Sequence, residues 1–302
     1  MPRPVLLQSR AGRNRVGRRR GVADALVLLG IAGALGLGAA TVRRFERAAE
    51  RDVAARLQGE NKKVRLRVSY PGVLSPAIGE ISRASVEASH FSVRGLPFLR
   101  EPWRSSRGRI DRLVVDLRDF ELTGLGVAQM TASIPNVRYD LAHAARHGEI
   151  RISRAGVGTS TVALRPEAIA AWLMRRSPGL LDVTGRIEDG KLGVKGRLRF
   201  SNFEIPFDVL SRVTGEGPRL LLDHPQIRLA GVLTEGKSVD ELVRALNPVV
   251  DVDRDLALGG AVSIRRVDVR DGLIVASGAV TIPASERPEA PGKNADGATP
   301  RR

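Results

Sequence analysis

Few side chains in this sequence form a pattern that suggests metal binding or catalysis. His143 and His147 lie four apart in "HAARH", so on a helix they would share a face that could hold a metal ion. The stretch lacks the acid of a zinc-protease motif and has no identifiable third ligand, so surface histidines are the better interpretation. "DVDRD", residues 251–255, spaces its carboxylates as a calcium loop does, but Leu256 and Val262 stand where that loop needs Gly and Glu. We therefore predict no metal site, and a turn or solvated strand edge at the aspartates.

No catalytic arrangement can be assigned either. The sequence contains no cysteine, which excludes cysteine nucleophiles, disulfides and thiolate metal sites. It has no Gly-rich phosphate loop and no nucleophile elbow. Its Ser, Asp and Glu residues are too loosely spaced to nominate a triad or a carboxylate dyad. The sequence predicts a protein that is not an enzyme, with no catalytic residue and no cofactor.

A third group of residues combines aromatic and basic side chains. The stretch "RGLPFLREPWR", residues 94–104, holds Phe98 and Trp103 in a chain with only 7 Phe and 2 Trp. Pro97 and Pro102 remove two backbone donors, which favours a loop over a central strand. Aromatic residues in such a loop either cap the end of a core, as most aromatics in a domain do, or contact a membrane interface.

The positive charge is large and unevenly distributed. The formal net charge is +16, residues 1–20 hold seven arginines and no acid, and +9 remains for residues 43–283. Nucleic acid and anionic lipid both offer the phosphate charge that such a surface attracts. Nucleic acid is the poorer fit, because the sequence has no recognition-helix, zinc-finger or RNA-recognition signature and few aromatics for base stacking.

The N-terminal region favours lipid. Residues 25–42, "ALVLLGIAGALGLGAATV", are eighteen uncharged residues, which as a helix measure about 27 Å against roughly 30 Å of bilayer hydrocarbon. We predict a basic cytoplasmic N-terminus at 1–20 and a transmembrane signal-anchor at 21–42, with the main domain outside the cytoplasm. A cleaved signal peptide is the alternative, since Gly38 and Ala40 are the small residues that precede such a cut. Both interpretations export the body.

The body is predicted to be β-rich. Residues 43–59 begin with a charged, Ala-rich helical pattern that we interpret as a solvated stem. Strand-like alternation then recurs through a predicted domain at 60–283. Residues 284–302 form a tail of Pro, Ala and charged residues that we predict to be disordered. Helices are predicted at 166–178 and from Ser238, where a capping box begins.

Repeated segments predict how the sheet is built. Residues 79–96 align without a gap on residues 108–125, an offset of 29 residues. Asp-Gly pairs at 189–190 and 271–272 are signals for type I′ hairpin turns. The sequence therefore predicts a β-rich α+β fold, in which a curved antiparallel sheet of repeated hairpin units carries two or more packed helices.

Across roughly residues 60–282 the chain resembles the LmeA-type phospholipid-binding family of the bacterial cell envelope. The motifs that carry the resemblance are "GLPFL" (95–99), "RGRIDRLVVDL" (107–117), "FELTGLGV" (120–127), "DGKLGVKG" (189–196) and "DGLIVASG" (271–278). The resemblance implies an extracytoplasmic lipid-binding role and brings no catalytic residues. By analogy with tubular lipid-binding proteins, the curved sheet would hold acyl chains in an apolar groove, with arginines at its mouth.

The predicted partner is therefore an anionic phospholipid or membrane surface, with an envelope protein as a further possible partner and no nucleic acid. The expected apolar contacts are Phe98, Leu99 and Trp103, and the expected headgroup-binding residues are Arg94, Arg100, Arg104 and Arg107. Two alternatives remain open. One is a structural or scaffolding envelope protein with a closed core, and the other is an undetected hydrolase acting on envelope lipid or glycan.

Overall fold

The computed structural model describes residues 43, 46–72, 75–94, 99–147, 149–200, 203–234 and 236–285. The chain divides after Arg44, and the fold below is that of the unit Phe45–Arg302. The predicted N-terminus at 1–20, the signal-anchor at 21–42 and nearly all of the predicted tail lie outside the described residues. Within the part of the chain that the structure describes, no helix is long and apolar enough to cross a membrane.

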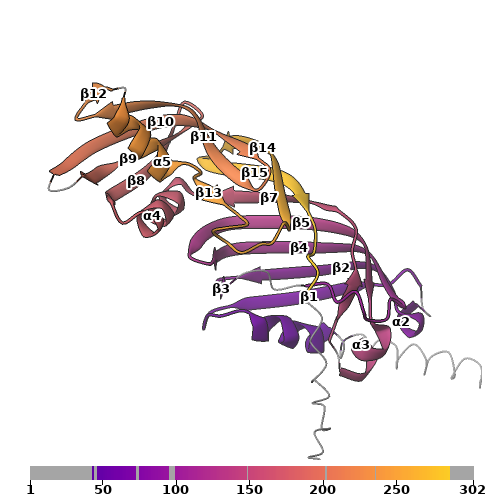
Figure 1. The fold of residues 1–302 in the computed structure, drawn as a ribbon. Helices are drawn as coiled ribbons and strands as arrows, with labels where there is room; N and C mark the ends of the chain where they lie inside the picture. The colour runs from indigo at the N-terminus through magenta and orange to yellow at the C-terminus, as the bar shows by residue number, and fades with distance from the viewer. Residues whose placement is uncertain are drawn as a thin grey trace, which may run out of the picture. The chain divides into compact units, whose positions relative to one another are not determined.

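The described part of the unit contains two sheets (Figure 1). The strands of the first sheet are β1 (Lys63–Ser69), β2 (Glu80–Ser89), β3 (Ser92–Val93), β4 (Gly108–Leu122), β5 (Leu125–Tyr139), β6 (Ile152–Arg154), β7 (Gly158–Leu164), β14 (Val262–Arg270) and β15 (Leu273–Val280). Their order is β1-β2-β4-β5-β7-β15-β14, with β3 paired to β4 and β6 paired to β5. The β-rich α+β class is thus confirmed.

The second sheet is antiparallel throughout and curls beside the first (Figure 1). Its strands are β8 (Leu180–Glu188), β9 (Lys191–Phe200), β10 (Phe203–Glu216), β11 (Arg219–Leu229), β12 (Val232–Leu233) and β13 (Val250–Asp251). The two sheets meet where Gly217 forms a bridge with Ile264 of β14. A Cβ at Gly215 would lie 2.3 Å from the Ile264 side chain, so this close approach requires glycine.

The internal repeat is a pair of parallel neighbours, not two hairpins. β2 pairs with β4 in parallel, with Ile81 opposite Ile110 and Val86 opposite Val115. Each pair is separated by the 29 residues of the repeat offset. The prediction of a wholly antiparallel sheet is wrong here, because residues 94–107 return the chain to the same end of the sheet, as a parallel pair requires.

The predicted hairpin turns are confirmed. Asp189 and Gly190 have φ of 48° and 69°, and Asp271 and Gly272 have φ of 50° and 72°. Positive φ at both central residues is the signature of a type I′ turn, whose twist matches that of the flanking strands. The turns join β8 to β9 and β14 to β15, so these late strands are hairpins as expected.

The first sheet has one apolar and one polar face. β4 buries Leu113 and Val115 on one side and carries Asp116 and Arg118 on the other. The alternation follows from the period of two along a strand. We call the side of Leu113 and Val115 the inner face, and the cavities described below lie on it.

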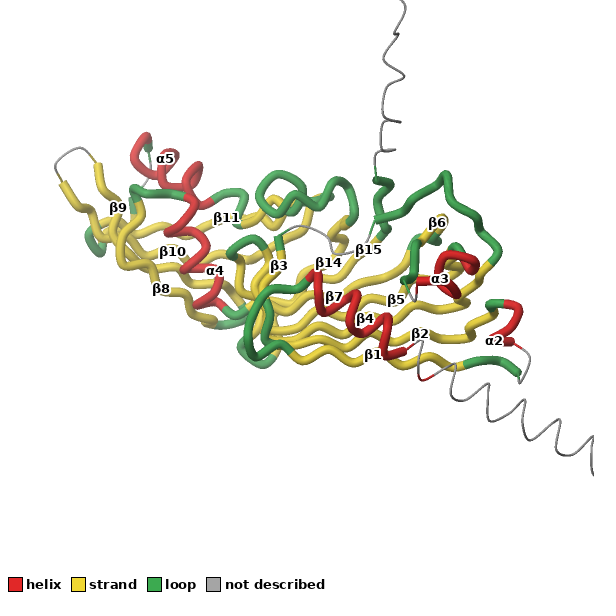
Figure 2. Tube along the Cα trace, turned by 90° about the horizontal axis from the view of Figure 1, so that it is seen from below, coloured by secondary structure: helices red, strands yellow, loops and turns green. Residues whose placement is uncertain are grey.

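Both predicted helices are present, as α4 (Pro166–Arg176) and α5 (Lys237–Leu246) (Figure 2). α4 has a proline in its first turn, as predicted, and buries Trp172 and Leu173. α5 begins one residue before Ser238, with Gly236 as its N-cap and no side-chain cap, so the predicted capping box is wrong. Two shorter helices are α2 (Ser75–Ile78) and α3 (Leu141–His147).

The predicted stem packs on the sheet. Residues 46–56 are helical, and Ala49 and Val53 on this helix are buried in the core. The Glu50 and Glu46 carboxylates accept hydrogen bonds, each of 2.9 Å, from the Leu66 and Val68 amides of β1. The helix thus protects an edge strand whose amides would otherwise be open to pairing. The interpretation of this helix as a solvated stem is wrong, because Ala49 and Val53 on one side of it are buried against the sheet.

Candidate functional site

A cavity of ≈ 100 Å³ lies on the inner face of the first sheet. The sheet contributes Val115 and Ala132, and Val53 of the helix at 46–56 closes one side. Among the described residues around the cavity, Thr281 is the only one with a polar side chain. The cavity is therefore a hydrocarbon environment.

A second cavity, of ≈ 60 Å³, adjoins the first where the two sheets meet. Its lining includes Leu220 of the second sheet. The residues that line both cavities are Phe120, Leu122, Met130 and Leu258. We call the two cavities together the inner groove, because these four side chains form a wall common to both.

The C-terminal segment covers part of the inner groove. Ile282 and Pro283 line the larger cavity. The Arg100 amide donates a hydrogen bond of 2.8 Å to the Pro283 carbonyl, and the Ser285 amide donates one of 2.7 Å to the Arg100 carbonyl. The Arg100 guanidinium also donates to the Ile282 carbonyl over 2.7 Å. We call residues 281–285 the strap, since Arg100 holds this segment across the groove.

The inner groove suits hydrocarbon, because among the described lining residues the polar side chains are Thr281 in the larger cavity and Ser160 and Ser277 in the smaller one. An apolar void offers water no hydrogen-bond partners and stays dry, and a polar ligand would lose its hydration on entering. The cavities of ≈ 60 and ≈ 100 Å³ are smaller than the roughly 300–1,000 Å³ of ordinary ligand clefts. A chain-shaped apolar ligand therefore needs the strap or the helix at 46–56 to move outward.

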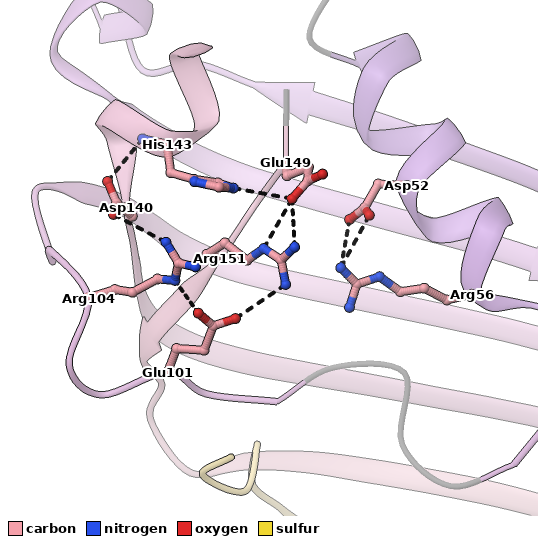
Figure 3. Close-up of polar contacts among 8 residues, drawn as sticks. All are labelled: Asp52, Arg56, Glu101, Arg104, Asp140, His143, Glu149 and Arg151. Carbon is pink, nitrogen blue, oxygen red and sulfur yellow. Dashed lines mark hydrogen bonds and ion pairs between the residues drawn. The ribbon is translucent and has the colours of Figure 1, made fainter. Parts of the chain in front are cut away.

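A polar network lies beside that helix (Figure 3). Arg151 donates to the Glu149 carboxylate over 2.6 Å, and the His143 Nε2 lies 3.2 Å from the same oxygen. These hydrogen bonds to His143 and Arg151 lower the pKa of Glu149 to about 2. On the helix, Arg56 pairs with Asp52 at 3.1 Å, beside Arg151.

Arg104 belongs to the same network (Figure 3). It forms an ion pair with Glu101, which also accepts a hydrogen bond of 3.3 Å from Arg151. Arg104 lies 4.0 Å from the Asp140 carboxylate just before α3, and the Glu101 amide donates to the Ile152 carbonyl over 2.7 Å. Ion pairs and a backbone bond thus fasten this loop to α3 and β6.

A solvent-open recess of ≈ 490 Å³ adjoins the network. Its lining residues are Arg104, Ser105, Arg107, Asp140, Ala142, His143, Arg146 and His147. The rings of the two histidines lie 4.6 Å apart, so the shared helix face expected for them is confirmed. Arg107 and Arg146 form no ion pair with a described residue. We call this the basic recess, and its unpaired cations can bind an anion.

The predicted apolar contacts lie away from the inner groove. Leu99 is 46% exposed and Trp103 is 38% exposed, and neither lines a cavity of the groove. Phe98 lies outside the described residues. The two described side chains are thus surface groups beside the strap and the basic recess.

The four predicted headgroup arginines have different surroundings. Arg94 is exposed, and Arg100 binds the strap. Arg104 is paired with acids, whereas Arg107 lines the basic recess without an acidic partner among the described residues. The structure brings Arg104 and Arg107 together and leaves Arg94 apart from the recess lining.

The aspartates at 251–255 form a turn, as interpreted from the sequence. The Asp251 carboxylate accepts hydrogen bonds of 3.2 and 3.1 Å from the Asp253 and Arg254 amides, and its pKa is lowered by these backbone bonds and by Arg219. The carboxylate therefore stabilises its own turn. Among the described residues, no group of three or more His, Asp or Glu side chains is placed to hold a metal ion.

The residues that line the inner groove were not among the predicted site residues. Phe120 and Met130 line both cavities, and Phe91 lines the larger one. One signal was available, because Phe91 and Phe120 occupy the same position in the two repeat copies. Arg146 was missed because nothing in the sequence places α3 beside the loop at 99–107.

The chain matches no protein-family model, no curated protein and no solved structure in the comparisons with known proteins. The resemblance to the LmeA-type family therefore stays a prediction.

Proposed function

We propose that this chain is a membrane-tethered, extracytoplasmic phospholipid-binding protein without enzymatic activity, and that an acyl chain occupies the inner groove. The observation that carries the proposal is the lining of the larger cavity, in which Thr281 is the only polar side chain among the described residues. Each CH₂ group moved from water into such surroundings gains about 0.8 kcal/mol. The apolar segment at 25–42 and the family resemblance support the same partner.

A scaffolding envelope protein with a closed core is the second candidate. The observation that favours it is the small volume of the two cavities, ≈ 60 and ≈ 100 Å³. In that case the groove would be a packing defect, and the basic surface would bind a protein. The experiment must therefore show whether lipid enters the groove.

The test is photolabelling of the full chain in vesicles of phosphatidylglycerol and phosphatidylethanolamine. The vesicles contain a phospholipid with a diazirine near the end of one acyl chain, and labelled peptides are mapped by mass spectrometry. We expect label on the groove wall, in peptides from 113–134 and 273–283. Label confined to 25–42 would refute the proposal and favour the scaffold.

Two matched variants separate entry into the groove from nonspecific labelling. Ala132→Phe places a ring in the larger cavity, and Val114→Phe places the same ring on the opposite face of the sheet. Relative to the label on 25–42, we expect Ala132→Phe to lower groove labelling severalfold and Val114→Phe to leave it unchanged. Overpacking of a core costs about 1–3 kcal/mol, so the melting temperature of both variants is measured as well.

A further inference from the structure

We propose that the end of the first sheet that carries α3 docks on the phosphate headgroups of an anionic membrane. The docking surface consists of the basic recess together with the exposed side chains of Ile78 and Trp103. The inference rests on the proposed function for the membrane anchor at 25–42 and for the identity of the partner as phospholipid, and its residues are separate from those of the inner groove.

The cations of the docking surface are free to bind phosphate. These cations are Arg107 and Arg146, which are exposed around the basic recess. Arginine binds phosphate oxygens through charge-assisted hydrogen bonds in a fixed fork geometry. The one acid in the described lining, Asp140, accepts a hydrogen bond of 3.0 Å from the His143 amide and faces Arg104. The recess therefore presents positive charge to solvent.

Apolar groups flank this charge on two sides. Ile78 is 56% exposed, at the end of α2. α2 lies against α3, because a Cβ at Gly79 would approach the Leu141 side chain to 2.7 Å. Trp103 precedes Arg104, which faces Asp140 across the recess. An amphipathic Trp beside cations is the composition that favours the headgroup region of a bilayer.

The N-terminal end of the helix at 46–56 lies at the same end of the first sheet as the docking surface. The helix at 46–56 runs antiparallel to β1, because Glu46 binds the Val68 amide and Glu50 binds the Leu66 amide. Its first residues therefore point to the end of the sheet that carries α2 and α3 (Figure 2). The apolar segment ends at Val42, and the four steps from there to Glu46 span at most ~14 Å. In the proposed function residues 25–42 are the membrane anchor, and this short connection would limit how far this end can move from the bilayer.

The opposite end of the unit provides a comparison surface. Phe203 is 72% exposed, and Val232 is exposed on a neighbouring hairpin. The adjacent Arg197 is paired with both Asp182 and Glu204. This end thus has exposed apolar side chains beside the paired Arg197 and beside Arg228 of β11, which lies opposite Leu233. It tests whether apolar exposure without a cluster of unpaired arginines is sufficient for docking.

The experiment uses Trp103 as a reporter in the full chain. The sequence has 2 Trp, and Trp172→Phe leaves Trp103 as the only one. The buried Trp172 Nε1 has no hydrogen-bond partner in the described part of the chain, so this replacement breaks no hydrogen bond there. The variant is reconstituted in phosphatidylglycerol vesicles that contain a lipid spin-labelled near its headgroup. We expect quenching of Trp103 emission that weakens as salt screens the charges.

Charge variants and a second reporter complete the test. Arg107→Gln and Arg146→Gln should each lower the docking equilibrium about fivefold, whereas Arg212→Gln and Arg228→Gln on the second sheet should not. Phe203→Trp, in a chain that also carries Trp103→Phe and Trp172→Phe, should place a Trp that is not quenched. Stronger quenching at 203 than at 103, or quenching at 103 that ignores both recess variants, would overturn the proposal. Loss of groove labelling with intact quenching would refute the proposed function alone.

Discussion

Phe91 and Phe120 stack with their ring centroids 5.0 Å apart and their planes 11° from parallel. The two residues occupy the same position in the two copies of the repeat, and the parallel pairing of those copies brings them together. Phe91 lines the larger cavity and Phe120 lines both. The stack therefore results from the parallel pairing of the two repeat copies, and it forms part of the wall of the inner groove.

We expect each of Phe91→Ala and Phe120→Ala to lower the free energy of unfolding by about 3–5 kcal/mol, because each leaves a cavity in the core. The loss of unfolding free energy in the double variant should be about 1 kcal/mol smaller than the sum of the losses in the two single variants. This difference measures the contribution of the stacking. Chemical unfolding of the full chain in mild detergent measures all three. As a control, Phe207→Ala in the second sheet should combine additively with Phe91→Ala, and a zero coupling in the stacked pair would contradict the geometry.

The strap can be locked by a disulfide, since the chain has no native cysteine. Arg100 and Ala284 are bridge partners, so their Cα atoms are close enough for Arg100→Cys and Ala284→Cys to be joined. If the strap must open for lipid to enter, the oxidised protein should exchange acyl-labelled phospholipid at least about tenfold more slowly than the reduced protein, since opening now requires breaking a covalent bond.

The same protein supplies its own control, because reduction restores a free strap without changing the sequence. The variant with Arg100→Ser and Ala284→Ser cannot form the disulfide, and its exchange rate shows the effect of losing the Arg100 side chain alone. Equal exchange rates before and after reduction would show that lipid does not pass under the strap.

Arg176 joins α4 to the segment after α5. Its guanidinium donates to the Ala245 carbonyl over 2.9 Å and to the Val249 carbonyl over 3.2 Å, and it lies 3.5 Å from Asp255. Burial lowers the pKa of this arginine, although Asp255 opposes the shift. Arg176→Met should destabilise the fold by about 2 kcal/mol, because it removes the donor from the carbonyls of Ala245, Pro248 and Val249. Asp255 keeps its ion pair with Arg254 and the hydrogen bond from the Asp251 amide.

The control for Arg176 is its neighbour on the same helix. Arg175 is exposed and only approaches the Trp172 ring, at 6.0 Å from the ring centroid. Arg175→Met should change the free energy of unfolding by less than about 1 kcal/mol. Thermal unfolding of both variants under the same conditions measures the difference. Equal losses of stability in the two variants would contradict the role given to Arg176.

The polar network predicts a dependence on acid. The pKa of Glu149 is about 2 in the folded chain, against an ordinary value of 4.5, so its pairing stabilises the fold fully above pH 4.5. This stability is lost as the pH falls from 4.5 towards 2. The wild type should exceed Glu149→Gln by about 1 kcal/mol or less at pH 6, since the carboxylate is partly exposed and screened. Unfolding at pH 6, 4 and 3 should show the gap closing, and a gap that widens in acid would contradict the pairing.

Much of the local structure could be predicted from the sequence. The alternation of apolar residues predicted the strands, the Asp-Gly pairs predicted two type I′ turns, and Pro166 marked the start of α4. These features depend on neighbours along the chain, through the pleat of a strand or the φ of a turn. The start of α5 was misplaced by one residue, because Gly236 takes the N-cap position ahead of Ser238.

The candidate site was less predictable for a physical reason. Arg104 and Arg107 were identified from their own loop, but their neighbours in the basic recess come from α3, more than thirty residues later. The inner groove combines residues from the helix at 46–56, both sheets and the strap. Cavities arise where distant segments fail to fill space between them, and periodicity within one segment carries no information about that space.

The β-rich class, the hairpin turns and the repeat can be recognised in the sequence, because each follows from residues that are adjacent or evenly spaced. How the two copies of the repeat pair depends on the tertiary structure. A 29-residue offset is compatible with two hairpins or with two parallel strands, and only the return of the chain through 94–107 sets Ile81 beside Ile110. The position of the charged helix at 46–56 also depends on the tertiary structure. The chain reverses direction after this helix, so that β1 lies antiparallel to it and the Leu66 and Val68 amides of this edge strand donate hydrogen bonds to Glu50 and Glu46.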